Sequence, residues 1–234
     1  MQTIKFNPVS KIAEQIVPRP RPAKEYFPQW YKETTAFHTP KPEFSLESGS
    51  ANKTIKHCMP FADAMTMGYI QESWVDLNFE FNEDGTFSFY EASPPPCVNF
   101  RSHVSMKIPS DFHQVEFTFI PQWMPESPSG YSVLLTHPLN HIDLPFYVTS
   151  GVIDSDKFTQ SLDNSSVPFY LKSSFSGIIP KGTPLFQYVP IKRDQWKSIE
   201  KEYDQEAQAK IAHQVRSKFW GGYKKNFWSK KIYS

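Results

Sequence analysis

The stretch SGVIDSDKF at residues 150–158 carries the residues whose types and spacing come closest to a chemical site. It places Asp154 and Asp156 two positions apart, after a glycine and two β-branched residues. If this stretch is a strand, the two carboxylates point to the same face, because side chains alternate along a strand. Paired carboxylates can bind Mg²⁺ together with the phosphates of a nucleotide. The alternative is a turn that the aspartates cap, with no ligand.

A second group of polar residues lies in HPLNHID, which contains His137, His141 and Asp143. A His-x-Asp pair supplies two of the three ligands in the facial triad of a non-heme iron oxygenase. The third ligand is a histidine on a later strand, but the one late histidine, His213, falls in a stretch with helical character. We therefore expect a loop without metal here, and these three residues stay as the weak candidate ligands.

The cysteines and the ends of the chain bear on its location. Cys58 and Cys97 are too few for a disulfide framework and lack the paired spacing of a zinc site. Because there is no disulfide framework, we expect a reduced, cytoplasmic protein. Free cysteines are most often small buried residues. The N-terminal residues have no long apolar segment typical of a signal peptide. No run of about 18 apolar residues occurs, so we expect no membrane partner.

Composition favours a β-rich globular protein. The chain has 234 residues, enough for one domain with a substantial core. Its 20 Phe, 11 Tyr and 21 Pro against only 9 Gly favour strands and irregular loops over a helical bundle. The 25 basic and 24 acidic residues almost cancel, so nothing in the net charge indicates binding to nucleic acid or to a membrane surface.

Residues 1–50 are expected to form an extended N-terminal arm. The sequence VPRPRPAKEYFPQWYKE alternates proline with basic residues and then adds aromatic ones. Pro-rich segments stay extended, and aromatic residues at this density usually need burial, which favours a strap packed on the body over a Pro-rich ligand for a partner.

Residues 51–192 are expected to form the β body. In GYIQESWVDLNFEFNEDGTFSFYE, apolar and polar residues alternate on both sides of Asp84-Gly85, which predicts a hairpin. Several short strands bounded by Pro or Gly follow at 128–192, a spacing typical of an all-β sandwich or barrel.

Residues 193–234 change in character. The run from Asp194 to Trp220 has no Pro or Gly and predicts one helix, with Asp194 as its N-cap and Gly221-Gly222 as its stop. The tail that follows interleaves lysines with aromatic residues. Such a tail can bind single-stranded nucleic acid, but packing on the body or on a neighbouring subunit is favoured by the neutral overall charge.

The region from 128 to 191 resembles the dUTPase and dCTP deaminase superfamily, which has the β-clip fold. The resemblance rests on three elements in order: Pro128–Tyr131 as the turn into a strand, Gly151–Asp154 as a hairpin element, and Gly182–Gln187 as the closing strand. It implies a β-clip barrel or sandwich, and relatives with this fold commonly form trimers.

The same resemblance implies a ligand site. It makes Asp154 the candidate catalytic residue, at the position that binds a sugar hydroxyl or orients a water, and adds Asp156, Tyr131 and Gln187 as ligand-binding candidates. The family's phosphate-contacting Arg-Ser-Ser motif falls at residues 136–139, where this chain has Thr-His-Pro-Leu. No Gly-rich phosphate lid follows either, so we expect no dUTP or dCTP hydrolysis.

A broader resemblance covers most of the chain, through segments such as KHCMPFADAMTMGYI and GIIPKGTPLFQYVPIKRDQWK. These are similar to uncharacterised proteins encoded by tailed phages. We therefore expect a phage-type accessory protein on a dUTPase-like scaffold, non-catalytic, that binds a nucleotide-like ligand or a protein. The alternatives are a virion structural or assembly subunit, a divergent Mg²⁺-dependent nucleotide hydrolase and, last, a non-heme iron oxygenase. The expected partner is a second copy or a phage or host protein, in the host cytoplasm or the virion. No cofactor is expected beyond Mg²⁺ with a nucleotide.

Overall fold

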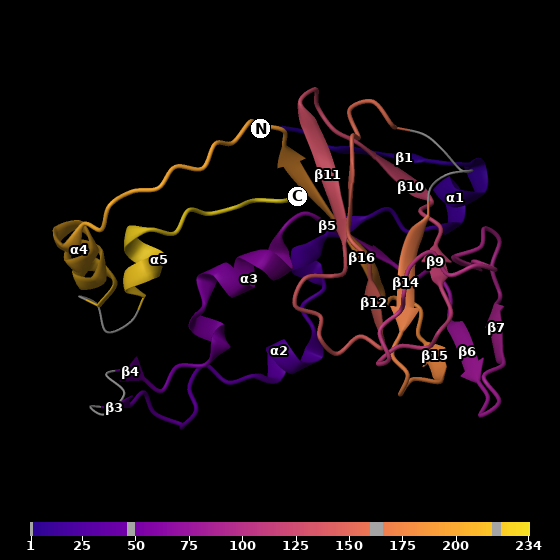
Figure 1. Ribbon diagram of the computed structural model, residues 1–234, viewed down its shortest axis with the longest axis horizontal. Helices are drawn as coiled ribbons and strands as arrows, with labels where there is room; N and C mark the ends of the chain where they lie inside the picture. The colour runs from indigo at the N-terminus through magenta and orange to yellow at the C-terminus, as the bar shows by residue number, and fades with distance from the viewer. Residues whose placement is uncertain (1, 46–49, 160–165, 217–220) are drawn as a thin grey trace.

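The computed structural model describes residues 2–45, 50–159, 166–216 and 221–234, and these form a mostly antiparallel β protein with helices at the C-terminal end (Figure 1). The expected mostly β class, with a C-terminal helix, is confirmed. None of the helices in these ranges is long and apolar enough to cross a membrane.

The largest sheet has five strands and carries the candidate site at one end. Every neighbouring pair in it is antiparallel. Its order is β13 (Gly151–Ile153), β11 (Tyr131–Thr136), β16 (Pro184–Lys192), β5 (Tyr69–Glu72) and β2 (Arg21–Pro22). Strand β16 is apolar along most of its length and is buried on both faces, as expected of a strand in the middle of a covered sheet.

Two smaller sheets hold the aromatic core. The four-stranded sheet consists of β12 (Phe146–Val148), β14 (Val167–Leu171), β9 (Phe117–Phe119) and β8 (Val98–Phe100). The three-stranded sheet consists of β15 (Gly177–Ile179), β6 (Leu77–Phe81) and β7 (Phe87–Glu91). Phe119 stacks on Phe169 with 3.9 Å between ring centroids. The edge contact of Phe79 with Phe117 at 5.1 Å then joins the two sheets.

The β6–β7 hairpin is the one predicted from the alternating pattern. Its five residue pairs are in register, and Gly85 at the turn has φ +82°. This backbone conformation is open to glycine and strained for most other residues, which explains the Asp-Gly turn.

The Gly151–Asp154 element, predicted as part of a hairpin, does not pair with the strand directly before it. Strand β12 pairs with β14 in one sheet, whereas β13 pairs with β11 in the other. The chain therefore crosses between sheets at residues 149–150, and β13 is an edge strand. Short-range turn signals cannot distinguish these two arrangements, because the pairing partner is distant in sequence.

The N-terminal region is built into the body and is not simply extended. It contains β1 (Lys5–Pro8), α1 (Lys11–Ile16), β2, the short 3₁₀ helix η1 (Ala23–Glu25) and α2 (Gln29–Glu33). Strand β1 pairs with β10 (Trp123–Glu126), so this segment extends the β body. Its aromatic residues pack inward, as Tyr31 is buried and stacks on Phe61 of α3 (Met59–Thr66). The remaining short elements are β3 (Phe44–Ser45), β4 (Ser50–Ala51) and η2 (Ile55–His57).

The C-terminal helix begins ten residues later than predicted. Helix α4 spans Gln205–Arg216, and Asp204 caps it by accepting a hydrogen bond from the Ala207 amide at 2.9 Å. Residues 195–204 are not helical, so Asp194 is no N-cap. A second helix, α5, spans Gly222–Asn226, and it takes the place of the predicted simple stop at Gly221-Gly222. A short helix is stable in water only when it packs on something. Of residues 194–216, those that form α4 are the ones that pack against α5.

Candidate functional site

The two aspartates of the SGVIDSDKF stretch lie where three strands of the large sheet end. Asp154 and Asp156 follow β13 in a turn, in which the Lys157 and Phe158 amides donate to the Asp154 carbonyl at 3.0 and 2.9 Å. The turn, and not a continued strand, is therefore the arrangement observed. Because β13, β11 and β16 are neighbours, Arg193 just beyond β16 reaches this turn.

Arg193 closes the acidic pair. Its Nη1 donates to Asp154 Oδ1 at 3.1 Å and to Asp156 Oδ1 at 2.9 Å. Its Nη2 makes a second, very short contact with Asp156 Oδ2, so this pair is two-pronged. A planar guanidinium matches a carboxylate in this geometry, which is among the stronger charged contacts in proteins.

The start of strand β11 completes the cluster. The Gly130 amide donates to Asp156 Oδ2 at 3.1 Å, and Ser132 Oγ donates to Asp154 Oδ1 at 2.8 Å. Arg193 Nη1 also approaches the Tyr131 carbonyl at 2.9 Å. Backbone and side chains thus satisfy both carboxylates from within the chain, and the cluster fastens β13, β11 and β16 together at one end.

The charges of Arg193, Asp154 and Asp156 hold the ends of β13, β11 and β16 together, and we call these three residues the clasp. The Asp156 side chain is only 6% exposed, and its hydrogen bond from Arg193 lowers its pKa to about 2. The same contact raises the pKa of Arg193 above its ordinary value. The Asp154 side chain is 59% exposed, so it is the one carboxylate of the pair that solvent reaches freely. The lowered pKa of Asp156 is the opposite of what a general acid needs.

Gln187 lies far from this cluster. In the β11–β16 register, Tyr131 pairs with Lys192 and Thr136 pairs with Gln187, so Gln187 is at the other end of the strand, roughly 17 Å away. Its Oε1 accepts from the Leu139 amide at 2.7 Å, and its Nε2 donates to the Met67 carbonyl. Gln187 is buried, joins α3 and the loop after β11 to the sheet, and does not share a site with the aspartates.

Tyr131 faces a different neighbour. Its side chain lines a groove of about 410 Å³ together with Tyr69, Tyr233 and other residues of the chain ends. Of the four residues predicted to bind a ligand, the structure brings Asp154 and Asp156 together, adds only the backbone of Tyr131, and leaves Gln187 apart.

The histidines of HPLNHID occupy the loop after β11. His137 Nε2 lies 3.1 Å from the His141 carbonyl, and the His137 ring stacks on Tyr147. Burial lowers the pKa of His141 to about 4, so this side chain is neutral at physiological pH. Asp143 is exposed. Within the described ranges, no three His, Cys, Asp or Glu side chains are grouped as they would be around a metal ion.

The best-developed charged network in the body was not predicted from the sequence. Glu116 on the loop side of β9 is completely buried and accepts hydrogen bonds from Arg101 Nη1 at 2.8 Å, the Ser105 amide at 2.9 Å and Tyr170 Oη at 3.0 Å. Burial alone would raise the pKa of Glu116, but the bonds from Ser105 and Tyr170 and the charge of Arg101 lower it overall. Glu116 thereby holds the exposed loop after β8 against the body.

A broad cleft of about 890 Å³ lies beside this loop. Its walls include Phe81, Lys107 and His113, and the His113 ring stacks on Phe81 with 3.5 Å between centroids. The His113 Nε2 lies 2.9 Å from the Phe175 carbonyl, so the ring is held in the wall by its neighbours.

The most unusual surface is the C-terminal arm, which we define as residues 193–227. Its first part carries three large apolar side chains in water: Trp196 is 89% exposed, Ile199 71% and Tyr203 74%. Four more exposed apolar side chains follow: Ile211 and Val215 on α4, Tyr223 on α5, and Phe227 at the C-cap of α5. Phe219 and Trp220, at the end of the run that was predicted to be helical, lie outside the described ranges.

The two helices of the arm form a tight pair. A Cβ atom on Gly222 would lie 2.0 Å from the Val215 carbonyl oxygen, so only glycine fits at this crossing. Asn226 Nδ2 donates to the Gln214 carbonyl at 2.8 Å and adds a polar contact. Figure 1 shows this pair at a distance from the sheets, joined to the body by two connecting segments that are neither helix nor strand.

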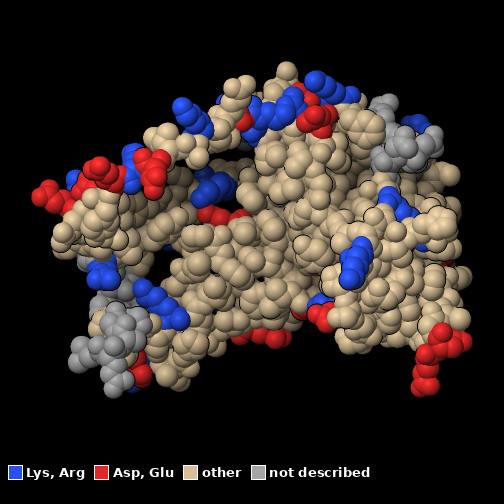
Figure 2. Space-filling view, viewed as in Figure 1, with Lys and Arg blue, Asp and Glu red and all other residues tan. Residues whose placement is uncertain are grey.

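Charge is mixed over the visible surface. Figure 2 shows basic and acidic side chains interspersed on this face, with open space between the arm and the body.

No family model matches the chain, and a search of curated proteins finds none that is similar. The chain's own geometry is therefore the basis for a functional proposal.

Proposed function

We propose that this protein is a non-catalytic, phage-type accessory protein that acts as a self-assembling subunit, with a β-clip-like body and a C-terminal arm that binds neighbouring subunits. The observation that carries the proposal is the row Trp196, Ile199 and Tyr203, which stands in water on a segment without helix or strand. Monomeric proteins rarely leave large apolar side chains clustered in solvent without a partner that covers them.

The burial of these side chains is energetically sufficient to matter. Each large apolar side chain contributes roughly 1.5–3 kcal/mol when fully removed from water, so three contribute roughly 4–9 kcal/mol. Association costs about 4–15 kcal/mol in lost translational and rotational freedom, so the three alone do not make a stable complex. A symmetric contact doubles the set, and the apolar face of α4 and α5 adds to it.

The acidic cluster supports the non-catalytic part of the proposal. A nucleotide bound at Asp154 and Asp156 would bring phosphates to two carboxylates that Arg193 already pairs with and that still carry a net negative charge with it. To recruit Arg193 or Mg²⁺, the ligand would have to break the two-pronged Arg193–Asp156 pair. A structural role needs no such change.

The adjacency of β11, β13 and β16 supports the β-clip-like body. The three elements that carry the resemblance, Pro128–Tyr131, Gly151–Asp154 and Gly182–Gln187, fall on these three neighbouring strands or at their ends. Elements that form one fold unit should be neighbours in the structure, as these are. A solved relative with the same strand connectivity would test the β-clip-like body.

Sedimentation analysis of the purified chain tests the assembly role. The test variant is Trp196→Ser, Ile199→Ser and Tyr203→Ser together. The matched control changes three apolar residues of the body that are also 59–73% exposed: Tyr90→Ser, Ile142→Ser and Ile178→Ser. We expect wild type and control to form an oligomer at micromolar concentration and the arm variant to sediment near 27.1 kDa. Wild type at monomer mass throughout that range would refute the proposal.

A further inference from the structure

The last residues of the chain return to the body and dock there. We define residues 228–234 as the tail. Trp228 Nε1 donates to Asp63 Oδ2 at 2.9 Å, and Lys231 Nζ pairs with the same oxygen at 2.6 Å. The Tyr233 ring meets the Tyr69 ring edge-on, with centroids 6.2 Å apart. Asp63 on α3 and Tyr69 on β5 thus form a tail site that is complementary to this tail in charge and in shape.

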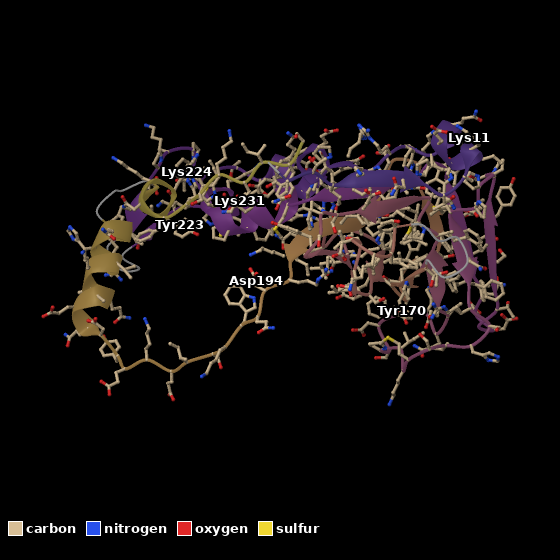
Figure 3. All side chains as sticks on the ribbon, turned by 90° about the horizontal axis from the view of Figure 1, so that it is seen from above. Lys11, Tyr170, Asp194, Tyr223, Lys224 and Lys231 are labelled. Atoms are coloured by element: carbon tan, nitrogen blue, oxygen red, sulfur yellow. The ribbon has the colours of Figure 1, made fainter. Side chains whose placement is uncertain are left out.

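The stretch between body and tail is held mainly at its two ends. At one end Arg193 is fixed by Asp154 and Asp156, and at the other Lys231 is fixed by Asp63. Figure 3 shows the chain bowing outward after Asp194 and coming back past Tyr223 and Lys224 to Lys231. In between, α4 packs on α5 and not on the sheets.

The connection is long enough to reach another molecule. Residues 194–204 lie between the fixed Arg193 and α4, and eleven extended residues span up to about 36 Å. That exceeds the radius of a domain of this size, so the arm can carry the tail beyond its own body.

We propose that the tail of one copy occupies the tail site of a second copy, and that the second copy returns its tail to the first. This inference rests on the proposed self-assembly and names its contact. The exchange preserves every tail contact of the closed chain, because the same residues meet in both arrangements. What differs is the linker. In the closed chain Trp196, Ile199 and Tyr203 stay in water, whereas in the exchanged dimer the two linkers run between the bodies and cover one another.

Reversing the Asp63–Lys231 charge pair gives a specific test. Asp63→Lys spoils the tail site and leaves a normal tail, and Lys231→Asp spoils the tail and leaves a normal tail site. Each variant alone brings like charges together at both contacts of its own dimer. An exchanged dimer of one copy of each has opposite charges at both contacts, one of them fully native. If each tail stays on its own body, mixing restores nothing.

Native mass spectrometry, with one variant labelled with ¹⁵N, detects the mixed dimer directly. We expect each variant alone to self-associate at least ~10-fold more weakly than wild type, because like charges face each other at the contact. The mixture should regain dimers, nearly all of them mixed. The chain with both changes should regain most of the wild-type association, short of the Trp228 hydrogen bond that lysine at position 63 cannot accept, which also shows that the substitutions are compatible with folding.

Two results would count against the exchange, and they have different consequences. If wild type assembles but the mixture gives no more dimer than the separate variants, tails do not exchange and the proposed assembly role stands. If wild type is monomeric at micromolar concentration, the assembly role fails, and the exchange fails with it.

Discussion

Replacement of Glu116 by glutamine should destabilise the body, because this carboxylate is the centre of a buried network. The side chain is fully buried, and its two oxygens accept hydrogen bonds from Arg101, Ser105 and Tyr170. Glutamine has nearly the same shape, but one of its two positions is a donor. Either the donors of Ser105 and Tyr170 or the guanidinium of Arg101 must then face an N–H group.

The expected loss follows from these contacts. Hydrogen bonds to a charged group contribute about 1.5–3 kcal/mol each, and a buried donor left without an acceptor costs about 1–3 kcal/mol. The Arg101 side chain is 40% exposed, so solvent screens its share and we count little for it. The buried donors of Ser105 and Tyr170 then set the loss. We take it as about 3 kcal/mol in the free energy of unfolding, which is the upper end for one such bond. In a chain of this length that lowers Tm by roughly 6–12 °C.

The effect should depend on pH with a definite sign. The pKa of Glu116 is lower in the folded protein than its ordinary value of 4.5. Its charge therefore contributes stability that is fully present above about pH 4.5 and is lost as the pH falls through the folded pKa. The difference between wild type and Glu116→Gln should be constant at neutral pH and shrink below about pH 4.5.

Urea denaturation followed by circular dichroism at neutral and acidic pH measures both effects. Tyr170→Phe is the matched control, since it removes one donor and leaves the carboxylate, and it should cost about 1.5 kcal/mol, the low end for one bond to a charged group. A Glu116→Gln variant within about 0.5 kcal/mol of wild type at neutral pH, the range of an ordinary surface substitution, would refute this account of the network.

Three further predictions concern the clasp, the ligand and the arm. Arg193→Lys keeps the charge but loses the two-pronged contact, so an NMR titration should find the pKa of Asp156 moved from about 2 towards 3.8, and an unchanged value would contradict the clasp. Nucleotides with Mg²⁺ should leave Tm unchanged, because Arg193 already pairs with both acids; a rise that Asp154→Ala abolishes would support the hydrolase instead. Gly222→Ala should push α4 from α5 and speed proteolysis within residues 205–226 while the Tm of the body holds, and equal cleavage rates would argue against the tight crossing at Val215.

Local patterns predicted what depends on local chemistry. The alternation around Asp84-Gly85 predicted the β6–β7 hairpin, because a two-residue side-chain period and a turn that suits glycine leave few alternatives. An amide in an apolar strand, such as that of Gln187, needs hydrogen-bond partners once it is buried, and Gln187 has them. Asp154 and Asp156 do lie together, but in a turn that Arg193 closes and not on one face of a strand.

Features that depend on distant pairing could not be predicted in the same way. Arg193 meets the aspartates only because β16 pairs with β11, which no short pattern specifies. Glu116 alternates with Val115 and Phe117 and so looks solvent-facing, but β9 lies between β14 and β8 and its second face is covered as well. The late start of α4 has the same origin, because helix propensity at residues 194–204 meets no surface on which to pack.

The central claim is that the arm is covered by a neighbouring subunit, and hydrogen exchange of residues 194–204 at several protein concentrations tests it most directly. These residues have no helix or strand, so in a monomer their amides should exchange almost as fast as in an unfolded peptide. We predict that this peptide becomes protected as the concentration rises through the micromolar range, in step with the oligomer mass, while peptides from β6 and β7 do not change. Fast exchange of residues 194–204 at every concentration, in a protein that nevertheless assembles, would contradict the account.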